Sequence, residues 1–382
     1  MLPLDRLTNY LAADPVNAEL ACALADLHLE AGHFAEAGQV LGGLPAGAQS
    51  QAGVQFRLAR LALMVGDYAG AEQGLQQLLA AGQDGPAIAH DLAFALLCQR
   101  RLDAASRVLQ DSLQRHGTSV ELLVLQARIA LMERQFAQAE QHVAAALALE
   151  PENAVAMGLR ALGRLDAGEL QSAGEAAALC LALHPDQHEA LLAAGSLALW
   201  QRDDGTAEIH FANALARFPN SGRALSGMGQ LHMLAGELEQ AREVLRRAVE
   251  TMPDHIGTWH ALAWTQLLLG EVTAAEESYR KALELDRNFA ESHGGLAIVD
   301  LLLGRPLEGE ANMKRALKLD PRCISGRYAR TLWLEQQGEQ ARSTKLFAEL
   351  LGEGALPGVS GQDPQAMASR LKSRILSGPS RH

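Results

Sequence analysis

The chain has 382 residues, and 33 Lys plus Arg against 45 Asp plus Glu give it a net charge of −12. This sign disfavours nucleic acid as the partner, because phosphate binding needs basic residues. Hydrophobic residues make up 48% of the chain but aromatic residues only 4%, as expected for an Ala- and Leu-rich helical protein rather than a sheet. No charge-free apolar run reaches the length that a membrane span needs.

The first predicted element is a helix over residues 4–13. It aligns with the second helix of the repeats that follow it, and Leu7 and Tyr10 fall at packing positions. Residues 1–17 are therefore predicted to form an N-terminal capping helix, because a terminal repeat must cover its apolar side. The first residues lack the basic stretch, apolar core and cleavage site of a secretory signal. A cytoplasmic location is expected.

From residue 18 the sequence repeats every 34 residues without insertion or deletion. Small residues recur in two columns, which mark where helix backbones come close. One column is Ala37, Ala71, Ala105, Ala139, Ala173, Ala207, Ala241, Ala275, Gly309 and Ser343, and the other is Ala25, Ala59, Ala93, Ala127, Ala161, Gly195, Gly229, Ala263, Ala297 and Thr331. Each repeat is too short to bury its apolar face alone, so neighbouring repeats are expected to stack.

A third column lies between the other two, and glycine dominates it. Glycine suits the left-handed residue that ends a helix. The column is Gly32, Gly66, Arg100, Arg134, Gly168, Arg202, Gly236, Gly270, Gly304 and Gly338. Prolines recur where the second helix should end, at Pro15, Pro151, Pro185, Pro219, Pro253 and Pro321. Each repeat is thus predicted to be helix A, a turn and helix B.

The repeat resembles the tetratricopeptide repeat. The eighth unit matches the family's consensus nearly throughout, with Trp259, Leu262, Ala263, Gly270, Ala275, Tyr279 and Ala282. Two other helical repeats are excluded. A pentatricopeptide array would have a period of 35 residues and would drift out of register with this one. An ankyrin repeat would show a Thr-Pro-Leu-His turn, which the sequence lacks. The resemblance implies an all-α fold, a right-handed α-solenoid (superhelix) of about ten 34-residue helix-turn-helix units with capping helices. Ten units would fill residues 18–351.

Two units depart from the pattern at the start of helix B. In the sixth, Asp204 replaces the usual Phe, Tyr or Leu and Gly205 follows it, so Asp204 is expected to cap a slightly delayed helix. In the ninth, Pro306 is expected to begin helix B, where its missing N–H costs nothing. Both are interpreted as local defects, with hinges as the alternative.

Glycine pairs inside helix A are interpreted as packing or groove-widening positions. They are Gly227 with Gly229, and Gly294 with Gly295. No strand precedes either pair, which argues against a phosphate-binding loop.

Residues 352–382 are predicted to be a loop, a C-terminal capping helix and a tail. Asp363 and Pro364 give a helix-start signal, and Met367, Leu371 and Ile375 form an apolar stripe. The basic residues opposite the stripe leave an alternative, a docking segment for an acidic partner.

The family resemblance implies that helix A lines a concave groove which binds a protein or peptide. Aromatic and Arg side chains are the residue types that most often anchor such partners. The residues predicted to line this groove are Phe56, Arg57, Arg60, His90, Phe94, Arg128, Trp200, Gln230, His260, Trp264 and Tyr328. For any single ring, the alternative is that it fills the inner curve. Some members of the family hold the terminal carboxylate of a peptide with Lys, Asn and Arg side chains from three successive A helices. No three successive units of this chain carry that set.

No catalytic residue, cofactor or metal is predicted. The 13 histidines are scattered without zinc-ligand spacing, and no nucleophile elbow is present. The array leaves no segment for a catalytic domain. Cys22, Cys98, Cys180 and Cys323 lie in different repeats, so they are expected to be buried or half-buried thiols.

The sequence therefore predicts a non-enzymatic scaffold or adaptor that holds a partner protein segment in the groove. One alternative is a chaperone or assembly factor for a bacterial secretion or envelope machine, because the Ala, Leu, Gly and Arg bias suits a GC-rich bacterium. Another is an accessory subunit that delivers substrates to a separate enzyme. Self-association through the terminal repeats is also open.

Overall fold

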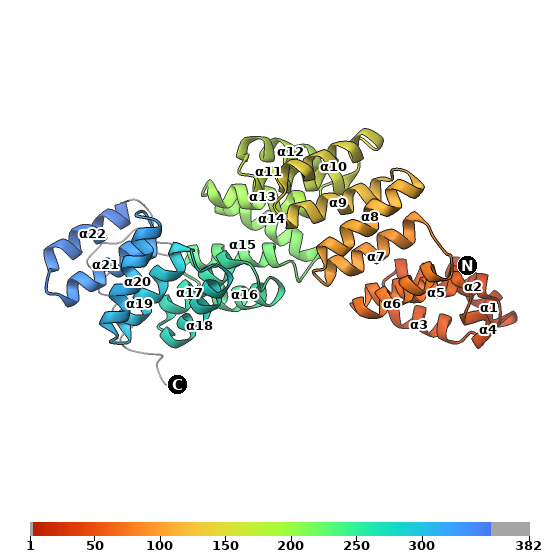
Figure 1. The fold of residues 1–382 in the computed structure, drawn as a ribbon, viewed down its shortest axis with the longest axis horizontal. Helices are drawn as coiled ribbons and strands as arrows, with labels where there is room; N and C mark the ends of the chain where they lie inside the picture. The colour runs from red at the N-terminus through yellow and green to blue at the C-terminus, as the bar shows by residue number, and fades with distance from the viewer. Residues whose placement is uncertain (1–2, 353–382) are drawn as a thin grey trace. The chain divides into compact units, whose positions relative to one another are not determined.

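A computed structural model describes residues 3–352, and over this range the chain forms 22 α-helices and no strand. The chain divides between His184 and Pro185 into two compact units. Figure 1 shows that each unit is a series of short helices joined by tight turns, with each helix returning alongside the one before it.

The first unit opens with α1 (Pro3–Ala13), followed by five helix pairs. Its A helices are α2 (Ala18–Glu30), α5 (Ala52–Met64), α7 (Pro86–Cys98), α9 (Val120–Met132) and α11 (Ala154–Asp166). Its B helices are α3 (Phe34–Gly42), α6 (Tyr68–Ala80), α8 (Leu102–His116), α10 (Phe136–Leu149) and α12 (Leu170–Leu183). The short helix α4 (Ala46–Gln49) lies in the connection between the first two pairs.

The second unit also holds five pairs. Its A helices are α13 (His188–Trp200), α15 (Gly222–Ala235), α17 (Ile256–Leu269), α19 (Ala290–Leu302) and α21 (Ile324–Gln336). Its B helices are α14 (Asp204–Arg217), α16 (Leu238–Thr251), α18 (Val272–Leu285), α20 (Pro306–Leu319) and α22 (Gln340–Gly352). Every A helix begins 34 residues after the previous one, and so does every B helix. The predicted period and helix order are confirmed.

The third column supplies the left-handed residue of each A-to-B turn, as predicted. Gly270 has a φ of 81°, and the arginines that replace glycine also have positive φ, with 62° at Arg100 and Arg202 and 59° at Arg134. A non-glycine residue pays roughly 1–2 kcal/mol for this conformation. The geometry of the stack therefore imposes the turn even where the residue does not favour it.

The expectation for Asp204 is wrong. Helix α14 begins at Asp204, in register with the other B helices, and is not delayed. Its N-cap is Asp203, whose side chain accepts a hydrogen bond from Thr206 N at 3.2 Å. Pro306 does begin α20 at the first helical position, as predicted.

Two expectations concern the ends of the chain. Residues 4–13 do lie in a helix, but Tyr10 is exposed, and Leu11 is the side chain that packs on the neighbouring core. The role of α1 as a cap stays a prediction. The predicted C-terminal helix from Asp363 to about Leu376 lies outside the described residues.

The small-residue columns form the centre of each unit. Ala71 and Ala105 in the first unit, and Ala241 and Ala275 in the second, are fully buried between helices. Large apolar side chains surround them, led by Leu75 and Leu109 in one unit and by Tyr279 in the other.

Replacing Ala241 by leucine should destabilise the second unit by about 1–3 kcal/mol, because the added side chain overpacks a closed contact. All four tryptophans lie in this unit, so urea unfolding followed by tryptophan fluorescence reports on it. The neighbouring Gln240 is exposed, and Gln240→Leu should change the free energy of unfolding by less than about 0.5 kcal/mol. Equal effects of the two substitutions would contradict the register.

Candidate functional site

Three neighbouring A helices of the first unit present predicted partner-binding residues at the same repeat positions. Helix α5 carries Phe56 and Arg60, α7 carries His90 and Phe94, and α9 carries Arg128. Helix α7 contacts both α5 and α9. The spacing of four residues puts each pair on one side of its helix. We call the surface formed by these residues of α5, α7 and α9 the first-unit face.

A hollow of about 390 Å³ opens on this face. Its lining residues come from all three helices and from the residue before α9, and they are Phe56, Arg60, Pro86, Ala87, His90, Asp91, Ser119 and Glu121. Ser119 is already engaged as the N-cap of α9, where its hydroxyl accepts from Leu122 N. The hollow therefore combines an apolar wall with a small number of charged groups.

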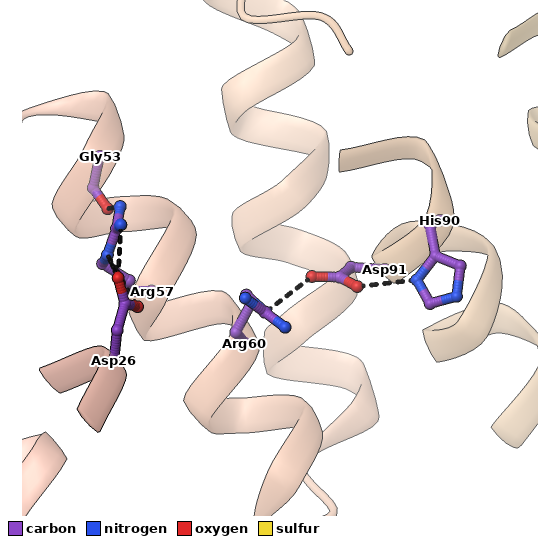
Figure 2. A network of polar contacts seen from close by, with 6 residues as sticks. All are labelled: Asp26, Gly53, Arg57, Arg60, His90 and Asp91. Carbon is purple, nitrogen blue, oxygen red and sulfur yellow. Dashed lines mark hydrogen bonds and ion pairs between the residues drawn. The ribbon is translucent and has the colours of Figure 1, made fainter. Parts of the chain in front are cut away.

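Asp91 is paired with two other side chains that line the hollow, Arg60 and His90. One of its carboxylate oxygens lies 3.3 Å from Arg60 Nε, and the other lies 3.0 Å from His90 Nδ1. The Arg60 guanidinium also lies over the Phe56 ring, 5.8 Å from its centroid, within cation–π range. Figure 2 shows Asp91 between Arg60 and His90. Because a carboxylate only accepts, His90 Nδ1 donates to it, and in the neutral imidazole Nε2 is left as an acceptor.

Arg57 has a different role from Arg60. It donates to Asp26 through Nε at 3.0 Å and Nη2 at 2.7 Å, and its Nη1 donates to Gly53 O at 3.1 Å. The hydrogen bond with Asp26 is the main factor that raises the pKa of Arg57. Figure 2 shows this clamp between α2 and α5, separate from the Asp91 group. The Arg57 guanidinium therefore stabilises the contact between α2 and α5. Arg60 is the better-placed cation for binding a partner.

Phe94 is the exposed aromatic residue of the first-unit face, with 37% of its surface accessible. Met64 and Met132 are also exposed, one turn beyond Arg60 and Arg128 on α5 and α9. Methionine adapts its shape to different partners. Sequence reasoning missed these two residues, although they occupy one repeat position and so carried the same column signal as the others.

Two predicted residues of the second unit lie in its core. Trp264 is 5% exposed and Tyr328 is 4% exposed. Their rings meet edge to face at 5.9 Å, and Tyr328 also contacts Phe347 at 5.9 Å. The alternative reading, that such rings fill the inner curve, therefore describes both residues.

The remaining predicted residues of the second unit have three different environments. Trp200 is exposed at the end of α13. Gln230 is half-buried and donates to Ser226 O within its own helix. His260 is half-buried against Tyr279, with ring centroids 5.4 Å apart. The structure does not join these three into one site.

The environment of His260 predicts a loss of stability in acid. Burial lowers the pKa of His260 from its ordinary value of 6.5, and the charge of Glu291 opposes part of this effect. The unfolded chain therefore binds more protons near this pH than the folded chain, so stability falls as pH drops through 6.5. Burial lowers the pKa of His142 and His210 in the same direction.

The measurement is urea unfolding of the second unit at pH 7.5 and pH 5.5, followed by tryptophan fluorescence. His260→Phe keeps an aromatic ring next to Tyr279 and removes the titrating group, so it should lose less stability between the two pH values than the wild type. An identical loss in both proteins would assign the pH dependence to other groups.

A second hollow of the first unit, of about 550 Å³, lies between α9, α10 and α11. Gly163 forms part of its wall, at a position where the other units carry a larger side chain, from Ala95 to Trp333. Glu140 at its rim is paired with Arg160 at 3.0 Å and Arg164 at 3.6 Å. None of the predicted partner-binding residues lines it.

Among residues 3–352, no group of three or more His, Cys, Asp or Glu side chains is arranged to hold a metal ion. Over the same residues, every helix is too short or too polar to cross a bilayer. Cys22, Cys180 and Cys323 are buried thiols and Cys98 is a half-buried one, as predicted. Burial raises the pKa of Cys323 to about 12, which makes it a poor nucleophile at neutral pH.

Comparison with known proteins identifies the repeat in part of the second unit and confirms the fold. Residues 220–288, which hold the seventh and eighth repeats, match the model of the tetratricopeptide repeat family. No curated protein matches the sequence.

Among solved structures, a monomeric mutant of IFIT1 with Gppp-AAAA is 16% identical over 97% of this chain and 94% of its own, with a TM-score of 0.55. The human IFIT1 dimer with PPP-AAAA gives the same values. A tetratricopeptide repeat protein from Parabacteroides merdae is 17% identical over 64% of this chain and 97% of its own, with a TM-score of 0.41. At such identities the likeness concerns the fold alone. Residues 220–288 are therefore tetratricopeptide repeats, and the helix order of the described residues continues the same 34-residue period through both units.

Proposed function

We propose that this chain is a non-enzymatic scaffold or adaptor whose first-unit face holds a segment of a partner protein. One observation carries the proposal: three contacting A helices present Arg60, Phe94 and Arg128 at the same repeat position, beside a hollow of about 390 Å³. Exposed aromatic and Arg side chains around a hollow are the usual anchors of protein interfaces.

The same face would serve the two alternatives. A chaperone for a bacterial secretion or envelope machine and a substrate-delivering subunit differ from a scaffold in the identity of the partner, not in the chemistry of the groove. A bacterial origin and a cytoplasmic location stay predictions from the sequence.

RNA is a weaker candidate than protein. The IFIT1 structures contain Gppp-AAAA and PPP-AAAA, and a triphosphate needs a strongly basic lining. Here Asp91 and Glu121 line the same hollow as Arg60, and the whole chain carries a net charge of −12. The charges that line the hollow of the first-unit face therefore favour a peptide over RNA.

The test is selection of random phage-displayed peptides on the full chain. Peptides enriched on the wild type should bind Phe94→Glu at least about 10-fold more weakly, because hot-spot aromatic residues carry much of the binding energy. Leu307→Glu makes a matched change at a residue of α20 that is 78% exposed, and it should leave binding unchanged. A 5′-triphosphate oligoadenylate is titrated in parallel.

Failure to enrich any peptide, or equal binding by wild type and Phe94→Glu, would contradict the proposal. Tight binding of the oligoadenylate that depends on Phe94 would favour RNA instead. Circular dichroism of each variant checks that its helix content is unchanged.

A further inference from the structure

The contact between the fourth and fifth units lacks one side chain that every other unit supplies. At the repeat position of Gly163, each of the other nine units carries a side chain that is buried or half-buried. These residues are Leu27, Leu61, Ala95, Ile129, Leu197, Leu231, Thr265, Val299 and Trp333. Gly163 lies inside α11, where glycine is less favourable to the helix than any of them. The sequence thus gives up stability at this one position.

A matched contact in the second unit shows what the glycine changes. The hollow at Gly163 has a volume of about 550 Å³, and the hollow two periods later, at Leu231, has about 230 Å³. The two hollows share most of their wall positions, such as Glu140 in the first and Glu208 in the second. Leu231 lines the smaller hollow at the position that Gly163 leaves without a side chain.

The walls of the larger hollow suit an uncharged apolar group. Leu131, Val143 and Leu159 line it, and the last two are almost completely buried. At the rim, Glu140 is paired with Arg160 at 3.0 Å, so its charge is offset within the fold. A charged ligand would lose its hydration here without gaining an unpaired partner at Glu140. An apolar side chain would bury its surface against the wall.

Arg164 at the rim favours an aromatic ring among apolar groups. Its Nη2 lies 3.6 Å from Glu140 and its Nη1 lies 3.5 Å from the carbonyl oxygen of Ser172, so both contacts are long. A guanidinium held this loosely can stack on the face of a ring. Glu169 lines the same hollow and carries the opposite charge, which balances the arginine for an uncharged ligand.

The tenth unit shows the largest side chain that the repeat accepts at this position. Trp333 stands there, and it packs on the core cluster that contains Leu301 and Met313. These two residues lie five periods after Leu131 and Val143, which line the hollow of the first unit. The repeat therefore accommodates an indole ring against the same wall positions in its own fold.

We propose that the hollow at Gly163 is a second recognition site, which takes a tryptophan side chain of a partner protein. The partner's ring occupies the space that the missing side chain of the fifth unit leaves open. No residue of the first-unit face lines this hollow. The inference therefore does not depend on the proposed function, and each can fail without the other.

The first measurement titrates N-acetyl-L-tryptophanamide into the full chain labelled with ¹³C-methyl valine. We expect the Val143 signal, assigned with Val143→Ile, to shift along a saturable curve. The signal of Val249, which is buried in the second unit, should stay in place. N-acetyl-L-lysinamide should shift neither signal, because the hollow offers no unpaired carboxylate at Glu140.

Gly163→Leu should weaken this binding at least about 10-fold, because leucine fills the hollow. The new Cβ would lie 3.0 Å from Leu131 Cδ2, the far end of a flexible side chain, and other units carry leucine here. The variant should therefore keep its helix content and unfold at the same or a higher urea concentration. Gly163→Ala should lose less affinity, and Gly205→Leu, in open space on α14, should lose none.

Phage-displayed peptides with one fixed tryptophan then test whether the ring comes from a protein. Enriched peptides should bind Gly163→Leu at least about 10-fold more weakly and bind Phe94→Glu as tightly as the wild type. An unchanged Val143 signal, equal binding of the lysine amide, or full binding by both Gly163 variants would overturn the inference. Binding of the tryptophan amide without enrichment of any peptide would also overturn it, and would assign the hollow to a small aromatic ligand.

Discussion

Replacing Trp264 by glutamate is expected to cost the second unit more than about 3–5 kcal/mol, the usual loss for removing a buried aromatic side chain. Trp264 is 5% exposed and packs on Tyr328, so the substitution also places a carboxylate among apolar side chains. Typical domains are stable by only about 5–15 kcal/mol. Urea unfolding followed by the fluorescence of Trp200, Trp259 and Trp333 measures the loss.

The matched control is Phe94→Glu, at the same repeat position five periods earlier. Phe94 is 37% exposed, so its replacement should leave the helix content and the thermal midpoint of the first unit nearly unchanged. If Trp264→Glu unfolded at the wild-type urea concentration, Trp264 would belong to an exposed surface rather than to the core.

Replacing Gly294 by alanine is expected to destabilise the second unit by about 1–3 kcal/mol or more, because the backbones of α19 and α21 meet at this residue. A methyl group there would overlap the backbone nitrogen of Gly326 and lie 2.7 Å from the carbonyl carbon of Ser325. The Glu291 carboxylate fixes the same contact, since it accepts from Ile324 N at 2.8 Å and Ser325 N at 2.9 Å. These backbones have little room to shift.

Gly205→Ala provides the opposite control in the same unit. Gly205 lies in the first turn of α14 with open space around it, and alanine favours a helix over glycine by up to about 1 kcal/mol. This variant should be as stable as the wild type or slightly more stable. The urea midpoints of Gly294→Ala and Gly205→Ala are measured by tryptophan fluorescence. Equal shifts of the two midpoints in the same direction would contradict a close approach of α19 and α21.

The repeat order was predictable because it depends on periodic features. Small residues at contacts and a left-handed residue at each turn recur every 34 residues, so each repeat supports the interpretation of the next. The prediction for Asp204 was wrong because it relied on one unusual residue rather than on the repeat position at which every B helix begins. Neighbouring repeats hold α14 in register, and Asp203 takes the capping role that was assigned to Asp204.

The burial of individual groove residues was not predictable from repeat position. Phe94 and Trp264 share one position, yet Phe94 is exposed and Trp264 is buried against Tyr328, two A helices further on. Gly294 and Gly295 supply the reason, since they let α21 come close on one side and accommodate the Tyr279 ring on the other. The sequence correctly suggested that this glycine pair is a packing position. It did not indicate that the close packing would bury Trp264.

The central claim is that the first-unit face binds the partner segment, and methionine-methyl NMR tests it directly. The exposed methyl groups of Met64 and Met132 lie on this face, whereas Met233 and Met313 are buried in the second unit. The chain is labelled with ¹³C-methyl methionine and titrated with the most enriched peptide. We expect the signals of Met64 and Met132 to shift in the wild type and to stay unchanged in Phe94→Glu. Saturable binding that leaves both signals in place would contradict the claim and assign the partner to another surface.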